Sequence, residues 1–219
     1  MKVGTDGVLL GAWAVLPPSG YVLDVGTGSG LIALMMAQRG QQLRVTGIDI
    51  DAEAVAQAQA NAGVSPFADR VEIRHCSLQE FVADAHHAHH FDSVVCNPPF
   101  FEQSLLSPDP QRSLARHTDS LPFTDLVACA ATLLKTGGRF SVILPTAVSD
   151  DFRVLCFSKG LYLSQSCLVQ TSKGKPSKRT LMCFLKEAHD EVKRCDLILT
   201  ENGARSDAYS RLTEDFYLH

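Results

Sequence analysis

Short apolar segments that resemble strands alternate with segments that resemble helices along the first two-thirds of the chain. The short segments have the length and β-branched content of buried strands, and the segment at 91–96 stops at Asn97-Pro98-Pro99, because proline cannot donate to a strand ladder. The segment at 31–38 is typical of a buried helix, and Asp51 suits the N-cap of an Ala- and Gln-rich helix that follows it. We therefore expect strands at 21–25, 43–49, 70–74, 91–96 and 139–144, and helices at 31–38, 52–61 and 121–135.

The last third of the chain has a different pattern. Apolar segments at 161–170 and 180–186 flank a basic loop, which predicts a terminal antiparallel hairpin. The amphipathic stretch from Tyr209 to Leu218 is expected to dock back on the body. Strands that alternate with helices, followed by such a hairpin, indicate an α/β fold with a mostly parallel sheet and helices on both faces.

Polar and small residues follow four of the predicted parallel strands. In open parallel sheets, ligands bind at the carboxyl ends of the strands. Four separate regions of the sequence fall there, namely Gly26–Gly30, Asp49, Cys76-Ser77 and Asn97–Phe100. We expect them to meet at one edge of the sheet and to form a single site.

Composition limits the class of protein. A chain of 219 residues, of which 45% are hydrophobic and 20% charged, is expected to fold as one globular domain. No apolar run reaches the length of a membrane span, so no membrane contact is expected, and no secretory signal is recognised at the start. The cysteines are odd in number and dispersed, which favours reduced thiols in the cytoplasm. Because the histidines at 86–90 have no metal-ligand spacing, we expect a solvated loop there and no metal site.

Charge is distributed unevenly along the chain. Residues 1–100 hold five Lys and Arg against ten Asp and Glu, whereas residues 101–219 hold fifteen against fourteen. The loop between the two hairpin strands has four cations, Lys173, Lys175, Lys178 and Arg179. Such a patch suits phosphate groups, although a short loop rich in Lys, Gly and Pro is also typical of a solvated turn.

A glycine-rich loop follows the first predicted strand. Val22-Leu-Asp24-Val-Gly26-Thr27-Gly28-Ser-Gly30 places its last glycine at 30, whereas a dinucleotide fingerprint needs it at 31. The glycines let a ligand approach the backbone closely. Asp49 ends the next strand, where a carboxylate suits the two hydroxyls of a ribose. This combination resembles the class I S-adenosylmethionine-dependent methyltransferases over most of the chain.

Asn97-Pro98-Pro99-Phe100 matches a motif of those methyltransferases that act on planar amino groups, namely adenine N6, cytosine N4 and glutamine amide. The lone pair of such an amine is delocalised, so two acceptors on its hydrogens help to direct it at the donor methyl group. The Asn97 side-chain oxygen and the carbonyl of Pro98, which is fixed by two rigid φ angles, suit this role. Phe100 suits stacking on the base. The alternative interpretation of this segment, a loop that merely ends a strand, fits the surrounding methyltransferase pattern poorly.

Within that superfamily the chain resembles the bacterial methyltransferases that modify adenine N6 at position 37 of valine tRNA, beside the anticodon. The opening Lys2-Val-Gly-Thr5-Asp6-Gly, the later Arg112-Ser-Leu-Ala-Arg116 and the ending Phe216-Tyr217-Leu218 are similar to segments of that family. The resemblance implies a Rossmann-like domain over residues 1–219, with a mostly parallel seven-stranded sheet and a C-terminal antiparallel hairpin. It implies S-adenosyl-L-methionine as cofactor and the tRNA anticodon loop as partner, with no obligate protein partner.

The resemblance also implies roles for individual residues. Those expected to be catalytic are Asn97, Pro98 and Phe100. Those expected to bind the cofactor are Thr5, Asp6, Asp24, Gly26, Thr27, Gly28, Gly30, Asp49, Ile50, Ser77 and Asn97. Those expected to bind the substrate are Pro99, Phe100, Phe101, Arg112, Arg116, Lys173, Lys175, Lys178 and Arg179.

The chain departs from the family pattern at two places. Family members usually have a further segment before the Lys-Val-Gly-Thr-Asp motif, and this segment is expected to be missing here. Ser77 stands where the family often has an acid that accepts from the adenine amine of the cofactor, so we expect weaker cofactor binding.

Three alternatives remain at this stage. A DNA adenine methyltransferase shares the Asn-Pro-Pro-Phe motif but usually adds a target-recognition region, for which 102–121 is short. A glutamine-amide methyltransferase acting on a release factor has a helical domain before the glycine loop, where this chain has only 21 residues before Val22. A non-catalytic RNA-binding module that retains the fold is the third.

Overall fold

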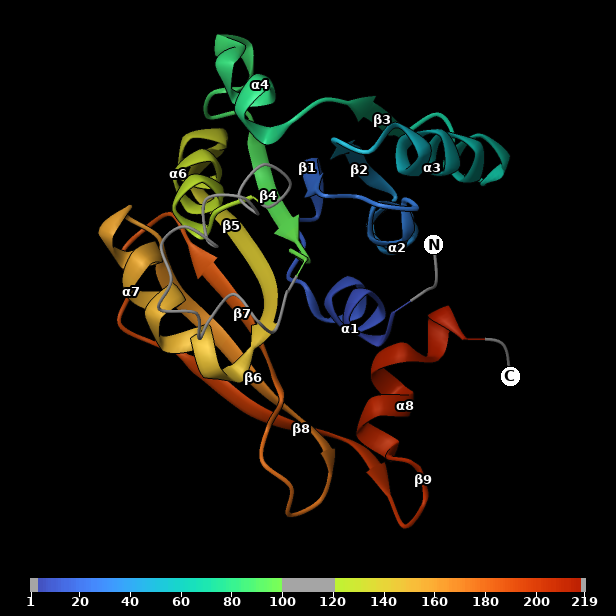
Figure 1. Cartoon of the computed structure of the whole chain (residues 1–219), viewed down its shortest axis with the longest axis vertical. Coiled ribbons are helices and arrows are strands. Elements are labelled where there is room, and N and C mark those ends of the chain that lie inside the picture. The colour runs from blue at the N-terminus through green and yellow to red at the C-terminus, as the bar shows by residue number, and fades with distance from the viewer. Residues whose placement is uncertain (1–3, 100–120, 218–219) are drawn as a thin grey trace, which may run out of the picture.

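One mixed sheet of nine strands runs through the part of the chain that the computed structural model describes, residues 4–99 and 121–217 (Figure 1). The strand order is β3-β2-β1-β4-β5-β7-β6-β8-β9. Strands β1 to β5 pair in parallel, and β7 pairs antiparallel with both β5 and β6. The strands are β1 (Ser19–Val25), β2 (Gln42–Asp49), β3 (Val71–His75), β4 (Phe91–Cys96), β5 (Leu134–Pro145), β6 (Tyr162–Ser172), β7 (Arg179–Leu185), β8 (Lys193–Glu201) and β9 (Ala204–Arg205).

Helices cover both faces of this sheet (Figure 1). One face packs against α1 (Thr5–Trp13), α2 (Leu31–Arg39), α3 (Ala52–Val64) and α8 (Asp207–Thr213). The other face packs against α4 (Leu78–Ala83), α6 (Phe123–Leu133) and α7 (Ser149–Ser158). Short 3-10 turns lie at Ala85–His87, Thr146–Val148 and Glu214–Phe216.

Strand β1 shows why the apolar segments form the core. Val22 packs among the residues under α2 and α3, whereas Leu23 packs among those under α4 and α6. Because both faces of a parallel sheet are buried, such a strand is apolar at consecutive positions. Asp24 is also fully buried. It is the exception to the apolar pattern of this strand, and its role lies in the candidate site.

Helix starts follow local capping chemistry. The Asp51 side chain accepts from the backbone N–H groups of Glu53 and Ala54 at 2.9 and 3.3 Å, which confirms the predicted N-cap of α3. Ser206 caps α8 in the same way, by accepting from Tyr209 N at 3.1 Å.

The sheet differs from the expected one in its width. The seven predicted strands are present with the predicted antiparallel hairpin, but β8 and β9 extend the sheet to nine strands, so the hairpin is not terminal. β8 pairs in parallel with β6, and Leu197 is buried beneath α8. As predicted, the C-terminal amphipathic stretch docks on the body, where Tyr209 packs into the core.

The helix expected at 121–135 is shorter. α6 ends at Leu133 and β5 begins at Leu134. Gly137 has a φ of 73°, which a helix does not accommodate, and the residues before it pair with β4 through Phe91 and Leu134. The pairing of Leu134 with Phe91 of β4 therefore determines where α6 ends.

Candidate active site at the carboxyl ends of the strands

The glycine loop connects β1 to α2 and is held against the end of β2. The backbone N–H groups of Gly26 and Thr27 both donate to the carbonyl of Ile48 at 3.0 Å. Gly26 has a φ of 68°, a left-handed conformation that favours glycine, and among the described residues no atom beyond its chain neighbours lies within 4 Å of the place where its Cβ would be. The loop therefore leaves open space beside its backbone, as the sequence predicts for a ligand cradle.

Asp24 lies at the floor of this loop. Its Oδ2 accepts from Thr27 Oγ1 at 2.7 Å and from Ala33 N at 3.1 Å, whereas its Oδ1 has no hydrogen-bond partner within the described residues. Burial raises the pKa of Asp24 to about 7, and the nearby Asp49 adds to this effect. A buried carboxylate oxygen without a hydrogen-bond partner is suited to accept a hydrogen bond from a cationic group of a ligand.

Each carboxylate oxygen of Asp49, at the end of β2, accepts a hydrogen bond from a backbone N–H group. Its Oδ2 accepts from Gly28 N at 2.8 Å and its Oδ1 from Asp51 N at 3.0 Å. A carboxylate has about four acceptor positions, so two remain for hydroxyl donors. The neighbouring Ile50 is 58% exposed, which leaves an apolar side chain beside the site. These features fit the ribose and base of a nucleoside.

Ser77 has a local structural role that the sequence analysis missed. Its hydroxyl accepts from Glu80 N at 3.1 Å, and its own N–H and hydroxyl donate to the Glu80 carboxylate at 2.8 Å. This reciprocal pair is a capping box at the start of α4, and the sequence Ser77-Leu-Gln-Glu80 could have revealed it. Contact between Ser77 and the cofactor stays a prediction.

The Asn-Pro-Pro segment leaves β4 beside the glycine loop. Val25 and Cys96 are register partners on β1 and β4, so Gly26 and Asn97 leave neighbouring strands at the same edge. Asn97 is half-buried, Pro98 is buried and Pro99 is exposed. The remaining residues predicted for this part of the site, Phe100, Phe101, Arg112 and Arg116, lie outside the described residues.

The structure joins two residues that the sequence analysis assigned to different parts of the site. Arg179, at the start of β7, donates from Nε to Asp6 Oδ2 in α1 at 2.8 Å. Thr5 is exposed at the start of the same helix. Lys173, Lys175 and Lys178 are exposed in the loop between β6 and β7, which leaves their predicted contact with phosphates untested.

Within residues 4–99 and 121–217, no group of three or more His, Cys, Asp or Glu side chains is arranged to hold a metal ion. In the same residues, no helix combines the length and the apolar character that crossing a membrane requires.

Comparisons with known proteins agree with this geometry. The model of the methyltransferase small domain family matches residues 6–149. A tRNA1(Val) (adenine(37)-N6)-methyltransferase of Bacteroides fragilis is 43% identical, over 100% of this chain and 91% of the relative. The Vibrio campbellii protein of the same name is 38% identical, over 100% of this chain and 89% of the relative.

A solved structure supports the fold. The crystal structure of a predicted O-methyltransferase from Agrobacterium tumefaciens superimposes with a TM-score of 0.75 at 20% identity, and the match covers 96% of each chain. The chain therefore belongs to the methyltransferase small domain family and, within it, to the group of its relatives named tRNA1(Val) (adenine(37)-N6)-methyltransferases.

Proposed function

We propose that the protein transfers a methyl group from S-adenosyl-L-methionine to N6 of adenine 37 in valine tRNA. One observation carries the proposal: relatives with that activity in their names align with the whole chain. The position of Asn97-Pro98-Pro99, where β4 ends beside the glycine loop, supports it. Because the proposed substrate is a tRNA, we place the protein in the cytoplasm, and the proposal calls for no obligate protein partner.

The residues around the glycine loop fit the proposed cofactor. Its sulfonium group supplies the electrophilic methyl. The Asp24 oxygen that has no hydrogen-bond partner among the described residues suits the ammonium group of the methionine part, directly or through a water molecule. The two open acceptor positions of Asp49 suit the ribose hydroxyls, and the open space at Gly26 admits the ligand close to the backbone.

In this proposal Asn97 and Pro98 hold the amino group of the target. The amide oxygen of Asn97 accepts one amino hydrogen, and the Pro98 carbonyl accepts the other. The lone pair of the nitrogen then points at the methyl group, and in-line positioning of two bound reactants accounts for most of the rate. A strong base is not required, because the methylated ammonium product loses its proton readily to water.

The target base is already unpaired in the anticodon loop, so moving it into the pocket costs little. We propose that Phe100 and Pro99 contact this base, with Phe101 beside it. Arg112, Arg116 and the cations of the β6–β7 loop bind the flanking phosphates in this proposal.

The proposal is tested by offering S-adenosylmethionine with a labelled methyl group to three substrates in parallel: unmodified valine tRNA, duplex DNA and a release factor. We expect label in the tRNA alone. Label in DNA or in the release factor would favour the corresponding alternative methyltransferase. Tight tRNA binding without label in any substrate would favour a non-catalytic RNA-binding module.

A further inference from the structure

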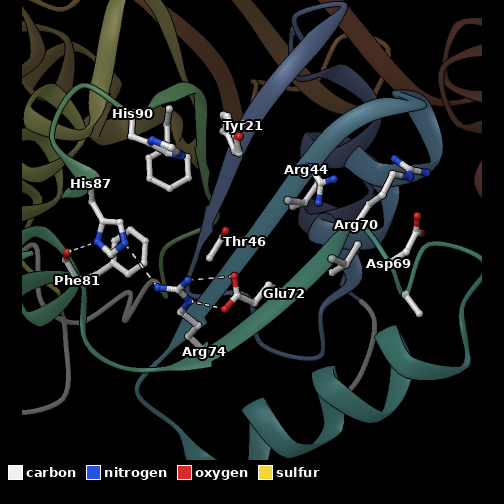
Figure 2. A pocket seen from close by; sticks show the side chains of 14 residues that line it. Tyr21, Arg44, Thr46, Asp69, Arg70, Glu72, Arg74, Phe81, His87 and His90 are labelled. Carbon is white, nitrogen blue, oxygen red and sulfur yellow. Dashed lines mark hydrogen bonds and ion pairs between the residues drawn. The ribbon is translucent and has the colours of Figure 1, made fainter.

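A hollow of about 480 Å³ lies on the face of the sheet that carries α4, near the beginnings of the parallel strands (Figure 2). We call it the arginine groove and define it by Tyr21, Arg44, Arg70, Arg74, His87 and His90. Arg44 precedes Asp49 by five residues on the same strand, which corresponds to roughly 17 Å. The end of the groove at Arg44 is therefore separate from the site at the carboxyl ends of the strands, whereas Arg74, the register partner of Ile48, lies near that site.

The groove exists because part of the sheet face is uncovered. Parallel sheets are normally covered on both faces, but α4 has only six residues. Along β2 the side chains of Leu43 and Val45 are buried under α2 and α3, whereas those of Arg44 and Thr46 line the groove. Alternation of this kind places polar side chains on the uncovered face, so the opening is encoded in the sequence.

Positive charge gathers in the groove although this half of the chain is acidic. Residues 1–100 have five Lys and Arg in all, and three of them, Arg44, Arg70 and Arg74, line the groove. Only Asp69 and Glu72 of the ten acidic residues in that half line it as well. The described residues of the lining, three arginines against two acids, therefore carry a net positive charge inside a region whose overall charge is negative.

Two of the three arginines are fixed by the fold. Arg70 donates to the carbonyls of Ala37, Gly40 and Leu43 at 2.8–3.1 Å. Arg74 forms a two-pronged ion pair with Glu72, at 2.7 and 3.0 Å, and lies 3.5 Å from Nε2 of His87. Figure 2 shows Arg74 in contact with Glu72 on one side and with the His87 ring on the other.

Arg44 is different. Its side chain makes no ion pair or hydrogen bond with any residue in 4–99 or 121–217, and it is exposed. Figure 2 shows Arg44 beside Arg70 on one side of the hollow, and the rings of Tyr21, His90 and His87 on the other. An unpaired guanidinium next to a second cation binds an anion strongly, and phosphate matches its fork of donors.

We propose that the arginine groove binds the phosphate backbone of the RNA substrate, with Arg44 as the principal contact. The inference rests on the proposed function, because a tRNA held at Asn97 supplies the polyanion. The rings of Tyr21, His87 and His90 on the side opposite Arg44 give the adjoining sugar or base a surface for stacking. The groove thus extends the RNA contact to a part of the molecule opposite the β6–β7 loop in the sheet order.

The test measures binding of unmodified valine tRNA to the full chain, by filter retention, between about 50 and 200 mM salt. We expect Arg44→Ala to raise the Kd about five- to tenfold and to reduce the slope of log K against log salt by about one. Arg44→Lys should keep most of the affinity because it keeps the charge. Arg153→Ala is the matched control, since this exposed arginine on α7 pairs only weakly, with Asp150 at 3.5 Å.

Equal Kd values and slopes for the wild type and Arg44→Ala would overturn the proposal. Inorganic phosphate is titrated in parallel, and Arg44-dependent phosphate binding with unchanged tRNA binding would also overturn it, since the groove would then take a small anion. If the wild type binds tRNA through Arg44 but methylates nothing, the proposed function fails and the groove stands. If the wild type methylates tRNA and Arg44→Ala binds it normally, only the groove fails.

Discussion

Asp6 and Arg179 are 173 residues apart in the chain, yet Oδ2 of one and Nε of the other are 2.8 Å apart. Asp6 belongs to the opening motif expected to line the cofactor, and Arg179 to the basic loop expected to hold RNA. The pair ties the start of α1 to the start of β7, so it physically connects the two parts of the predicted site.

The first prediction concerns this pair. We expect Asp6→Asn and Arg179→Ala each to lower the free energy of unfolding by about 0.5–1 kcal/mol, because both side chains are about 30% exposed and solvent weakens the interaction. The double variant should lose less than the sum of the two. Urea unfolding of the four proteins measures this coupling, and strictly additive losses would show that the pair contributes nothing.

The second prediction concerns pH and Asp24. Burial raises the pKa of Asp24 to about 7, so the carboxyl is mostly protonated at pH 6 and mostly ionised at pH 7.5. If the ionised form binds the cofactor ammonium, S-adenosylhomocysteine should bind roughly five- to tenfold more tightly at pH 7.5 than at pH 6. Calorimetric titration at both pH values measures the difference.

Asp24→Asn is the control for the pH effect. This variant should bind S-adenosylhomocysteine weakly and almost equally at the two pH values.

The same pKa shift of Asp24 predicts a trend in the stability of the protein. The folded-state pKa of Asp24 lies above the ordinary aspartate value of 3.8, so the contribution of Asp24 to the free energy of unfolding should fall as pH rises from about 4 through about 7. An unchanged pH trend in Asp24→Asn would assign the effect to another group.

The third prediction separates the two roles of Ser77. Removing its hydroxyl with Ser77→Ala should lower the free energy of unfolding by about 1 kcal/mol, because the N-cap of α4 is lost. It should also raise the Kd of S-adenosylhomocysteine if the hydroxyl accepts from the adenine amine. Glu80→Ala removes the other half of the capping box, so it should destabilise the protein but leave cofactor affinity unchanged. Equal cofactor affinities for all three proteins would limit Ser77 to capping.

The fourth prediction concerns Asn97. Asn97→Ala should reduce kcat about a hundredfold or more, because the amino group of the target loses one of its two acceptors and its alignment. Cofactor affinity should change little, since Asp24, Asp49 and the glycine loop remain. Single-turnover methylation together with a cofactor titration measures both quantities. Near-normal turnover by this variant would remove Asn97 from the mechanism.

Much of the fold could be predicted, because the parallel strands are buried on both faces and therefore appear as apolar runs. The glycine loop, Asp49 and the end of β4 were expected at one edge, and the register of Val25 with Cys96 and with Ile48, the residue before Asp49, confirms this. β8 was missed because it is largely exposed, with Leu197 its only buried residue, so its apolar pattern is weak.

Pairing between distant residues could not be predicted. Nothing in the local sequence around Asp6 or Arg179 indicates that the two side chains meet. The same holds for the arginine groove, in which residues of three strands and the turn after α4 converge only through the sheet order. The Ser77–Glu80 capping box, by contrast, is a local pattern, so it could have been predicted from the sequence alone.

The most direct test of the central claim is to map the methylated position. Unmodified valine tRNA is incubated with the wild-type protein and S-adenosylmethionine, digested with a nuclease and analysed by mass spectrometry, with a transcript carrying guanosine at position 37 as control. We predict N6-methyladenosine in the fragment that contains position 37, and no methylation of the control. Methylation at any other nucleotide, or of the control transcript to the same extent, would contradict the account.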